Sequence, residues 1–335
     1  MIHPVMRILL VKTSSLGDVV HNLPVASDIA RHLPETCIDW LVEEGFAELP
    51  RLHPAVQRVV PVALRRWRRA PLARASWREF AAFRADLQAE PYDCVLDTQG
   101  LIKSAALAVQ ARLTLVGRRC GFAAAGAREP LAALSYHRRI DVDPRLHAIE
   151  RNRLLASRCL GLPQPGPLDY GIDASPWAAP WLNGPYAVLL TASSRVDKQW
   201  PQEHWRALAQ WLDRQGLTSV FPGGTPAERA AAAELAARSP RAVAAPAMNL
   251  TELARVLAGA RLVVGVDTGL VHLAAALGRP TLALFIASDP ELTGVRAGDR
   301  ALNLGRRGAP PHPTAVFAAS QTLLAAAAAE GAPCA

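Results

Sequence analysis

Short apolar segments alternate with helical patterns along this chain of 335 residues, and the alternation runs through twice. The apolar segments that predict strands lie at residues 7–11, 37–43, 56–62, 92–98 and 113–117, and again at 186–192, 217–224, 261–266 and 280–285. The clearest helical patterns cover residues 16–33, 204–216, 226–239, 249–260 and 269–278. Strands that alternate with helices favour a parallel sheet with helices on both faces. The sequence therefore predicts an α/β protein with doubly wound, Rossmann-like sheets.

A change in composition divides the chain. Residues 161–185 are rich in proline and glycine, which is typical of a linker, and the strand–helix pattern restarts after them. We expect an N-terminal domain over 1–172, a C-terminal domain over 173–313, and an alanine-rich helix within 314–335 that could cross back to the N-terminal domain. Two such domains form a cleft at the carboxyl ends of their strands, where ligands of these sheets usually bind.

Hydropathy and cysteine usage limit the class of protein. No apolar run approaches the roughly 20 residues that a membrane-spanning helix needs, and the apolar start at 7–11 is too short for a signal peptide. We therefore expect a cytoplasmic protein. The five cysteines are odd in number and lack CxxC spacing, which argues against a disulfide framework and against structural zinc. They are expected to be small buried residues.

The net charge of +8 lies mainly in the N-terminal half. A basic domain of this kind favours an anionic partner: a phosphorylated substrate, a membrane surface or a nucleic acid. Two basic regions stand out, and their arginines are Arg65, Arg66, Arg68 and Arg69 in the first and Arg128, Arg138 and Arg139 in the second. Arginine forks suit phosphate and carboxylate groups, and Trp67 could touch a membrane interface. No sequence signature of a nucleic-acid-binding module accompanies these regions.

Lysine is rare in this chain, with three lysines against 34 arginines. Lys12, Lys103 and Lys198 each lie in or beside a loop between a predicted strand and a predicted helix. A position that keeps lysine in such a composition needs a compact point charge on a flexible stem, such as one that contacts a phosphate oxygen. Chance survival at the surface is the alternative.

The first loop, Lys12-Thr13-Ser14-Ser15-Leu16-Gly17-Asp18, joins a strand to a helix. It matches neither the phosphate-binding GxxxxGK[ST] order nor GxGxxG, so a nicotinamide dehydrogenase is disfavoured. Gly17 permits close approach of a ligand, and Ser15 offers a helix cap. Asp18 is either a first-turn carboxylate that complements the helix dipole or a general base for a substrate hydroxyl.

In the second half, Asp267-Thr268-Gly269 follows an apolar strand and opens a helix, which suits a diphosphate. His272 lies one turn further along the same helical face, and such a histidine is as often merely packed as functional. Lys198 follows another strand, where a cation could neutralise a leaving diphosphate. Glu228 could bind a ribose or act as a first-turn carboxylate.

The segments KTSSLGDVVHNLPV, WLVEEGFAELP, ALRRWRR, DTQGLIKSA, AREPLA, SSRVDKQWP and GVDTGLVHLAAALGRPT together resemble the ADP-heptose:lipopolysaccharide heptosyltransferases of glycosyltransferase family 9. The resemblance covers nearly the whole chain and is strongest to the branch that adds the first inner-core heptose. It implies a GT-B fold, two Rossmann-like domains with the donor held mainly by the C-terminal one. It also implies an inverting transfer without a metal or other cofactor.

The resemblance also implies a role for individual residues. Asp18 would be the general base and Lys198 would balance charge on the departing ADP. The donor ADP-heptose would contact Ser193, Ser194, Lys198, Glu228, Met248, Asp267, Thr268, Gly269 and His272. The acceptor Kdo2-lipid A would contact Lys12, Ser15, Gly17, Arg65, Arg66, Arg68, Arg69, Arg128, Arg138 and Arg139.

We therefore expect a monomeric enzyme that transfers L-glycero-D-manno-heptose from ADP-heptose to the Kdo of Kdo2-lipid A. It would be cytoplasmic and attached by charge to the inner leaflet of the inner membrane, with no nucleic-acid partner. A later heptosyltransferase of the same pathway is the nearest alternative. A basic nucleic-acid-binding module and a GT-B nucleotide-sugar epimerase are the alternatives from other classes.

Overall fold

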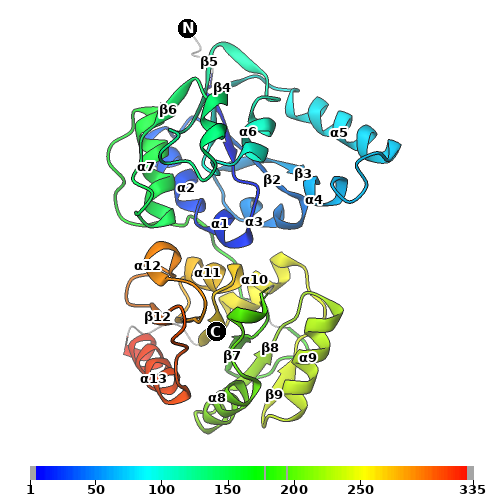
Figure 1. Cartoon of the computed structure of the whole chain (residues 1–335). Helices are drawn as coiled ribbons and strands as arrows, with labels where there is room; N and C mark the ends of the chain where they lie inside the picture. The colour runs from blue at the N-terminus through cyan, green and yellow to red at the C-terminus, as the bar shows by residue number, and fades with distance from the viewer. Residues whose placement is uncertain (1–4, 177–178, 194, 330–335) are drawn as a thin grey trace. The chain divides into compact units, whose positions relative to one another are not determined.

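The computed structural model of this chain describes residues 5–176, 179–193 and 195–329. The chain divides into two compact units, Met1–Ile172 and Asp173–Ala335 (Figure 1). Each unit is built around one sheet of six strands. Among the described residues, none of the helices combines the length and the apolar character that crossing a bilayer would require.

The N-terminal unit contains a sheet in the order β3-β2-β1-β4-β5-β6, and every neighbouring pair is parallel. Its strands are β1 (Arg7–Val11), β2 (Cys37–Glu43), β3 (Val56–Val62), β4 (Tyr92–Asp97), β5 (Leu113–Phe122) and β6 (Arg138–Ile140). Its helices are α1 (Leu16–Val20), α2 (Leu23–His32), α3 (Glu48–Arg51), α4 (Leu64–Trp67), α5 (Arg74–Leu87), α6 (Ile102–Ala108) and α7 (Ala148–Leu160), with 3-10 turns η1 (Glu44–Phe46) and η2 (Pro130–Ser135). The order of strands reverses between β1 and β4, as in a doubly wound sheet.

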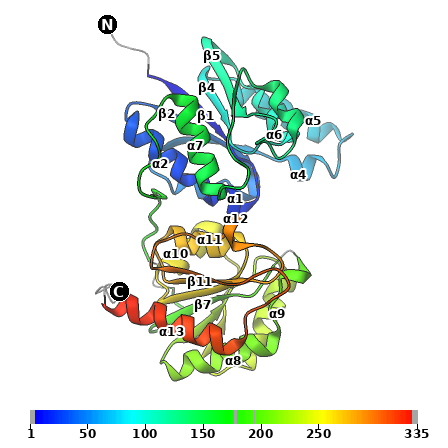
Figure 2. The same ribbon diagram turned by 60° about the vertical axis from the view of Figure 1, so that its left-hand side comes forward.

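Helices cover both faces of this sheet. On one face, Phe83 and Leu87 of α5 and Leu107 of α6 pack on buried side chains of β1 to β4. On the other face, α2 and α7 lie side by side (Figure 2). The guanidinium of Arg153 in α7 donates two hydrogen bonds, of 2.7 and 2.8 Å, to the carboxylate of Asp28 in α2, and both side chains are buried. This buried bidentate ion pair holds α7 in a fixed position against α2.

The helix predicted over 16–33 is two helices, α1 and α2. The break falls at Asn22, the N-cap of α2, and Pro24 stands in the first turn after it. Proline has no N–H to donate within a helix, but it fits the first turn, where the N–H groups have no helical partner. The second helix therefore begins where the first ends.

The C-terminal unit repeats the arrangement, with a parallel sheet in the order β12-β11-β10-β7-β8-β9. Its strands are β7 (Tyr186–Leu190), β8 (Thr218–Phe221), β9 (Ala242–Ala244), β10 (Leu262–Val266), β11 (Thr281–Phe285) and β12 (Ala301–Gly305). Its helices are α8 (Gln202–Arg214), α9 (Pro226–Ala237), α10 (Leu250–Ala258), α11 (Gly269–Ala276), α12 (Pro290–Thr293) and α13 (Pro313–Ala329), with one 3-10 turn, η3 (Val196–Lys198). The two sheets confirm the expected pair of doubly wound α/β domains.

The alanine-rich segment near the C-terminus forms α13. The sequence left open that this segment crosses back to the N-terminal domain. The structure instead packs α13 on α8 and on strands β10, β11 and β12 of its own unit. Val316 and Leu323 are buried in a core shared with Trp205 of α8, and the ring of Phe317 stacks on that of Trp211. Burial of this apolar helix face holds α13 to the C-terminal sheet.

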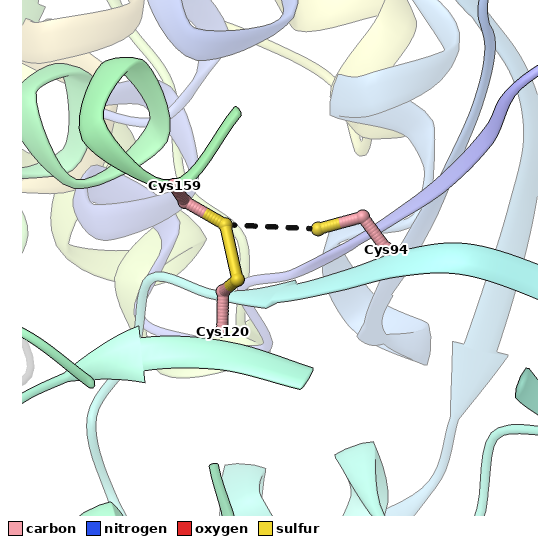
Figure 3. A group of neighbouring side chains, drawn as sticks. All are labelled: Cys94, Cys120 and Cys159. Carbon is pink, nitrogen blue, oxygen red and sulfur yellow. Dashed lines mark hydrogen bonds between the residues drawn. A yellow bond between two sulfur atoms is a disulfide. The ribbon is translucent and has the colours of Figure 1, made fainter. Parts of the chain in front are cut away.

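Three cysteines from separate elements meet in the N-terminal unit (Figure 3). Cys120 in β5 and Cys159 in α7 form a disulfide across 39 residues of chain. The Sγ atom of Cys94 in β4 lies 3.7 Å from that of Cys159. The disulfide corrects the expectation of isolated thiols, because the fold brings together cysteines whose spacing along the chain carries no pairing signal.

Candidate active site

The polar loops singled out from the sequence lie at the two points where strand order reverses. In the N-terminal unit, β1 and β4 are neighbours, and the loops after them begin at Lys12 and Thr98. In the C-terminal unit, β7 and β10 are neighbours, and the loops after them contain Lys198 and Asp267. Ligands of doubly wound sheets bind outside the carboxyl ends of the strands at this reversal. Each unit therefore presents its candidate residues where such a fold binds ligands.

Asp18 lies in the first turn of α1. The backbone N–H and the hydroxyl of Ser15 donate to its Oδ2 atom at 2.7 and 3.1 Å, which forms a capping box. A guanidinium nitrogen of Arg128 lies 3.9 Å from the same oxygen. The carboxylate is a quarter exposed, and no hydrogen bond from any of the described residues reaches its Oδ1 atom. Asp18 thus combines an anchored oxygen with one that remains available to accept a proton.

Lys12 is buried, although the sequence suggested that it contacts the acceptor. Its ammonium donates to the carbonyl of Thr98 at 2.7 Å and to Oδ1 of Asn152 in α7 at 3.3 Å. Burial lowers the pKa of Lys12 from 10.5 to about 8, while the charges of Asp18 and Asp97 act in the opposite direction. Lys12 therefore joins β1, the loop after β4 and α7 inside the unit, and contact with an acceptor stays a prediction.

The lowered pKa of Lys12 predicts a pH effect on stability. Between pH 8 and 10.5 the unfolded chain keeps this proton while the folded chain loses it, so the stability of the fold rises with pH in that window. The full contribution is on the order of 3 kcal/mol, about 1.4 kcal/mol for each pKa unit. Urea denaturation of the protein and of Lys12→Met across this range measures it. An equal pH dependence in the two proteins would contradict the assignment.

The basic string 65–69 is divided between paired and free side chains. Arg66 binds Glu44 and Glu79, and the guanidinium of Arg65 lies over the ring of Phe46 at 5.0 Å. Trp67 donates from Nε1 to Glu79 at 2.7 Å and packs edge-on against Phe80 and Phe83, so its partly buried ring contacts the protein core. Arg68 and Arg69 are exposed, and within the described part of the chain neither side chain forms an ion pair. These two remain available to an anionic ligand.

The three arginines of the second basic region differ in their contacts. Arg128 is exposed and lies near Asp18, as the acceptor role would need. Arg138, in β6, donates to the carbonyl of Cys159 at 2.8 Å and so supports α7. Arg139 is the next residue of the same strand and is exposed. The structure therefore brings Arg128 to Asp18, and places Arg138 and Arg139 on the edge strand β6.

Asp267 is the centre of the polar group in the C-terminal unit. Lys198 and the hydroxyl of Ser288 each donate to its Oδ2 at 2.5 Å, and Nε2 of His272 lies 3.4 Å from Oδ1. Burial alone would raise the pKa of Asp267, but the hydrogen bonds from His272, Lys198 and Ser288 hold it well below its usual range. These hydrogen bonds favour the carboxylate form of Asp267, and they place the Nζ atom of Lys198 beside it, where a ligand could share that donor.

The start of α11 lies directly beside this group. Thr268 is the N-cap and Gly269 the first residue of the helix. The Oγ1 atom of Thr268 is buried, and no hydrogen-bond partner for it lies among the described residues. Ser193, in the loop after β7, accepts a hydrogen bond from the backbone N–H of Arg195 at 3.3 Å. Ser194, the other predicted phosphate contact, lies outside the described residues. Free helix amides and an unpaired hydroxyl beside a lysine suit an anion.

Glu228 and Met248, predicted to contact the nucleoside, lie at the starts of two further helices. The Oε2 atom of Glu228 accepts from the backbone N–H groups of Gly224 and Thr225, both at 2.9 Å, in a capping box of α9. Glu228 therefore acts as a first-turn carboxylate that caps α9, which was one of its two expected roles. Its contact with a ribose stays a prediction. Met248 is half-buried immediately before Asn249, the N-cap of α10.

The structure adds site residues that the sequence did not single out, namely Ser288 after β11, Gln99 after β4 and Asn152 in α7. Ser288 binds Asp267, and Gln99 binds the segment of the first loop that precedes Asp18. The available signal for Ser288 and Gln99 was a polar residue soon after an apolar strand. Nothing local marks Asn152, whose contact with Lys12 spans 140 residues.

One group of side chains in the described part of the chain converges closely enough for a metal ion: Cys94, Cys120 and Cys159 (Figure 3). Two of these sulfurs form the disulfide, so Cys94 alone remains a thiol. Burial raises the pKa of Cys94 to about 12, which opposes the thiolate that binds metals. The group contains neither Asp18 nor Asp267. Because two of its three sulfurs are joined in a disulfide, we do not interpret it as a metal site.

Comparisons with known proteins agree with this geometry. The family model of glycosyltransferase family 9 (heptosyltransferase) matches residues 80–315. The chain is 47% identical over 291 residues to lipopolysaccharide heptosyltransferase 1 of Escherichia coli K12, covering 86% of this chain and 90% of that one. It is 47% identical over 293 residues to the protein of that name from Pseudomonas aeruginosa, covering 86% and 81%.

Among solved structures, the Escherichia coli heptosyltransferase WaaC with ADP superposes with a TM-score of 0.84 at 42% identity, covering 93% of this chain and 98% of that one. The Escherichia coli ADP-heptose heptosyltransferase II shares the fold, with a TM-score of 0.76 at 20% identity, covering 96% and 99%. The expected GT-B class of fold is thereby confirmed. On these matches the chain is a glycosyltransferase and belongs to glycosyltransferase family 9, the heptosyltransferases.

Proposed function

We propose that this glycosyltransferase moves L-glycero-D-manno-heptose from ADP-heptose to the Kdo of Kdo2-lipid A, and so adds the first heptose of the lipopolysaccharide inner core. The observation that carries the proposal is 47% identity, over most of both chains, to proteins named lipopolysaccharide heptosyltransferase 1. The match to heptosyltransferase 2 is weaker, 34% identity over 101 residues and 29% of this chain. The first-heptose reaction is therefore preferred over the later one.

Asp18 is proposed as the general base. A carboxylate that accepts the proton of the acceptor hydroxyl raises the nucleophilicity of that oxygen as it attacks the anomeric carbon of heptose. The anchored Oδ2 atom fixes the side chain, and Oδ1 is the oxygen that would take the proton. The acceptor oxygen attacks that carbon on the face opposite to ADP. The C–O bond to the acceptor forms as the C–O bond to the diphosphate breaks, so the configuration of the carbon is inverted.

The C-terminal unit is proposed to hold the donor. The amides at the start of α11 and the unpaired hydroxyl of Thr268 would bind the diphosphate. Lys198 would transfer one of its hydrogen bonds from Asp267 to the departing phosphate and neutralise the charge that develops there. Asp267 would then be free to accept hydrogen bonds from heptose hydroxyls. With the ammonium in this role we propose catalysis without a metal, which predicts that a chelator leaves the rate unchanged.

Arg68, Arg69 and Arg128 are proposed to bind the carboxylates and phosphates of the acceptor. Each is exposed, and Arg128 already lies near Asp18. Guanidinium groups bind carboxylate and phosphate in a bidentate manner, so a highly anionic acceptor suits them. Arg66 is a weaker candidate because Glu44 and Glu79 already occupy its guanidinium.

We also propose that the enzyme works as a monomer in the cytoplasm, at the inner leaflet of the membrane that carries its lipid acceptor. Exposed apolar and basic side chains occur together from the end of α4 into the first turn of α5, a segment (residues 68–77) that we call the α4–α5 surface. Leu72 is 89% exposed and Trp77 61% exposed, and Arg68, Arg69 and Arg74 flank them. Apolar side chains among arginines match the interface of an anionic bilayer.

The α4–α5 surface predicts binding to anionic vesicles. The protein is expected to sediment with phosphatidylglycerol vesicles and not with phosphatidylcholine vesicles, and an Arg68→Ala/Arg69→Ala/Trp77→Ala variant is expected to lose at least tenfold in vesicle affinity, since each arginine near such a surface contributes about 1 kcal/mol. Arg306→Ala/Arg307→Ala, an exposed arginine pair of the C-terminal unit, is the matched control. Equal losses in the two variants would assign the binding to net charge alone.

A transfer assay tests the proposed function directly. Purified protein is incubated with ADP-heptose and Kdo2-lipid A, and the product is identified by mass. One heptose should be added per acceptor, with release of ADP. Absence of product, or equal product from an acceptor that already carries the first heptose, would overturn the choice of acceptor. Release of sugar and nucleotide without any acceptor would favour an epimerase or a hydrolase.

A further inference from the structure

The loop after β4 forms several hydrogen bonds with the loop that leads to Asp18. The ammonium of Lys12 donates to the carbonyl of Thr98 at 2.7 Å. The ammonium of Lys103, at the start of α6, donates to Oγ of Ser14 at 3.0 Å. The side chain of Gln99 lies between these two contacts along the chain. None of these three contacts is local, since each joins residues at least 85 positions apart.

The carboxamide of Gln99 forms hydrogen bonds with both the N–H and the carbonyl of Ser14, and also with the N–H of Thr13. Its Oε1 accepts from the backbone N–H of Thr13 at 3.0 Å and from that of Ser14 at 3.2 Å. Its Nε2 donates to the carbonyl of Ser14 at 2.5 Å. Gln99 is 5% exposed, so water does not compete for these bonds. A side chain that offers both an acceptor and a donor fixes the orientation of this backbone segment.

Gln99 is itself fixed by a buried carboxylate. Asp97, which is fully buried at the end of β4, accepts from the backbone N–H groups of Gln99 at 2.8 Å and Gly100 at 3.3 Å. The hydroxyl of Tyr136 donates to its other oxygen at 2.7 Å. Gly100 has a positive φ of 65°, which lets the loop turn back over the carboxylate. The backbone of Gln99 is therefore anchored to a buried carboxylate that is itself hydrogen-bonded on both oxygens.

The chain continues from Ser14 to Ser15, whose N–H and hydroxyl hold the carboxylate of Asp18. We propose that Gln99 is a positioning residue for the transfer reaction, which acts through Ser14 and Ser15 to fix the carboxylate of Asp18. The inference rests on the proposed role of Asp18 as base. A misplacement of about 1 Å at a reacting group costs roughly 10²-fold in rate, so loss of these bonds should slow turnover without affecting the donor.

The test compares Gln99→Met, which keeps the length of the side chain and removes its hydrogen bonds, with Gln88→Met. Gln88 donates to the carbonyl of Gln110 at 2.8 Å in the same unit, away from Asp18, so it is the matched control. We expect kcat of Gln99→Met to fall 30- to 100-fold, with KM for ADP-heptose changed less than twofold. Gln88→Met should keep kcat within twofold. A Gln99→Met enzyme with the kcat of its control would overturn the inference.

A double-mutant comparison separates this inference from the assignment of the base. If Gln99 acts through Asp18, adding Gln99→Met to Asp18→Asn should cause no further loss of kcat. A full further loss would show that Gln99 acts elsewhere, with the base assignment intact. Wild-type kcat in Asp18→Asn alone would instead overturn the base. The variant Lys103→Met gives a second measurement, at an exposed side chain whose replacement should not disturb the core. A fewfold lower kcat at constant KM for the donor would support the inference, and an unchanged kcat would oppose it.

Discussion

Replacing Asp18 by asparagine is expected to lower kcat by about 10³-fold, within the range of about 10²- to 10⁴-fold that a general base contributes. Asparagine still accepts the hydrogen bonds from Ser15 that cap α1, so the local fold is kept, but it cannot take a proton from the acceptor. Since the proposed donor residues lie in the other unit, the affinity for ADP-heptose should not change. Steady-state kinetics and calorimetric titration with ADP measure the two effects.

The matched control for this prediction is Asp141→Asn, at an exposed aspartate of the same unit. It makes the same chemical change without touching α1 and should keep full activity. An Asp18→Asn enzyme that retained more than a tenth of wild-type kcat would remove Asp18 as the base. A parallel loss of ADP affinity would point instead to a structural effect that reaches the donor.

Lys198→Met is expected to lower kcat/KM by about 10²- to 10³-fold, the usual cost of removing one group that stabilises developing negative charge. The same substitution removes the hydrogen bond to Asp267, whose carboxylate keeps Ser288 and His272 as partners. The loss should appear mainly in kcat, because the ammonium is needed most when the ADP oxygen departs. Stopped assays over a range of ADP-heptose concentrations distinguish kcat from KM.

Lys198→Arg is the informative companion of that variant. It keeps the charge, but a guanidinium is larger and planar and cannot replace a compact ammonium between Asp267 and a phosphate. We expect it to recover less than a tenth of the lost activity. Full recovery would mean that charge alone matters at this position, and the rarity of lysine in this chain would then carry no functional information there.

The central strands were predictable because they are buried on both faces and therefore form continuous apolar runs. The bounds of the central strands β1 and β2 agree with the predicted segments. Those of β3 agree as well, although β3 is an edge strand, because its seven residues still form a recognisable apolar run. Strands β6, β9 and β12 were not predicted, because they are edge strands of three to five residues with partly exposed side chains. The string 65–69 was interpreted as a basic patch whose Trp67 could touch a membrane interface. Its first residues belong to helix α4, where Trp67 packs inward.

The residues of the candidate site also divide into those that local sequence could identify and those that it could not. Asp18, Lys198 and Asp267 could be found from sequence because each follows an apolar strand within a short motif. Gln99, Ser288 and Asn152 could not be assigned, since their partners lie 85, 21 and 140 residues away. The number and spacing of the cysteines argued against a disulfide framework, but Cys120 and Cys159 form a disulfide because β5 and α7 are adjacent in space.

The sequence by itself determined the class of fold, the family and the loops that carry the chemistry, because these depend on local hydropathy and on short motifs. Only the tertiary structure decided which strands are neighbours, and hence that the loops of Lys12 and Thr98, and those of Lys198 and Asp267, meet at the reversals of strand order. It also separated the three lysines into one beside the donor candidates and two that brace the loop of Asp18. The physical reason is that hydrogen bonds between distant segments form only after the sheet has set their positions.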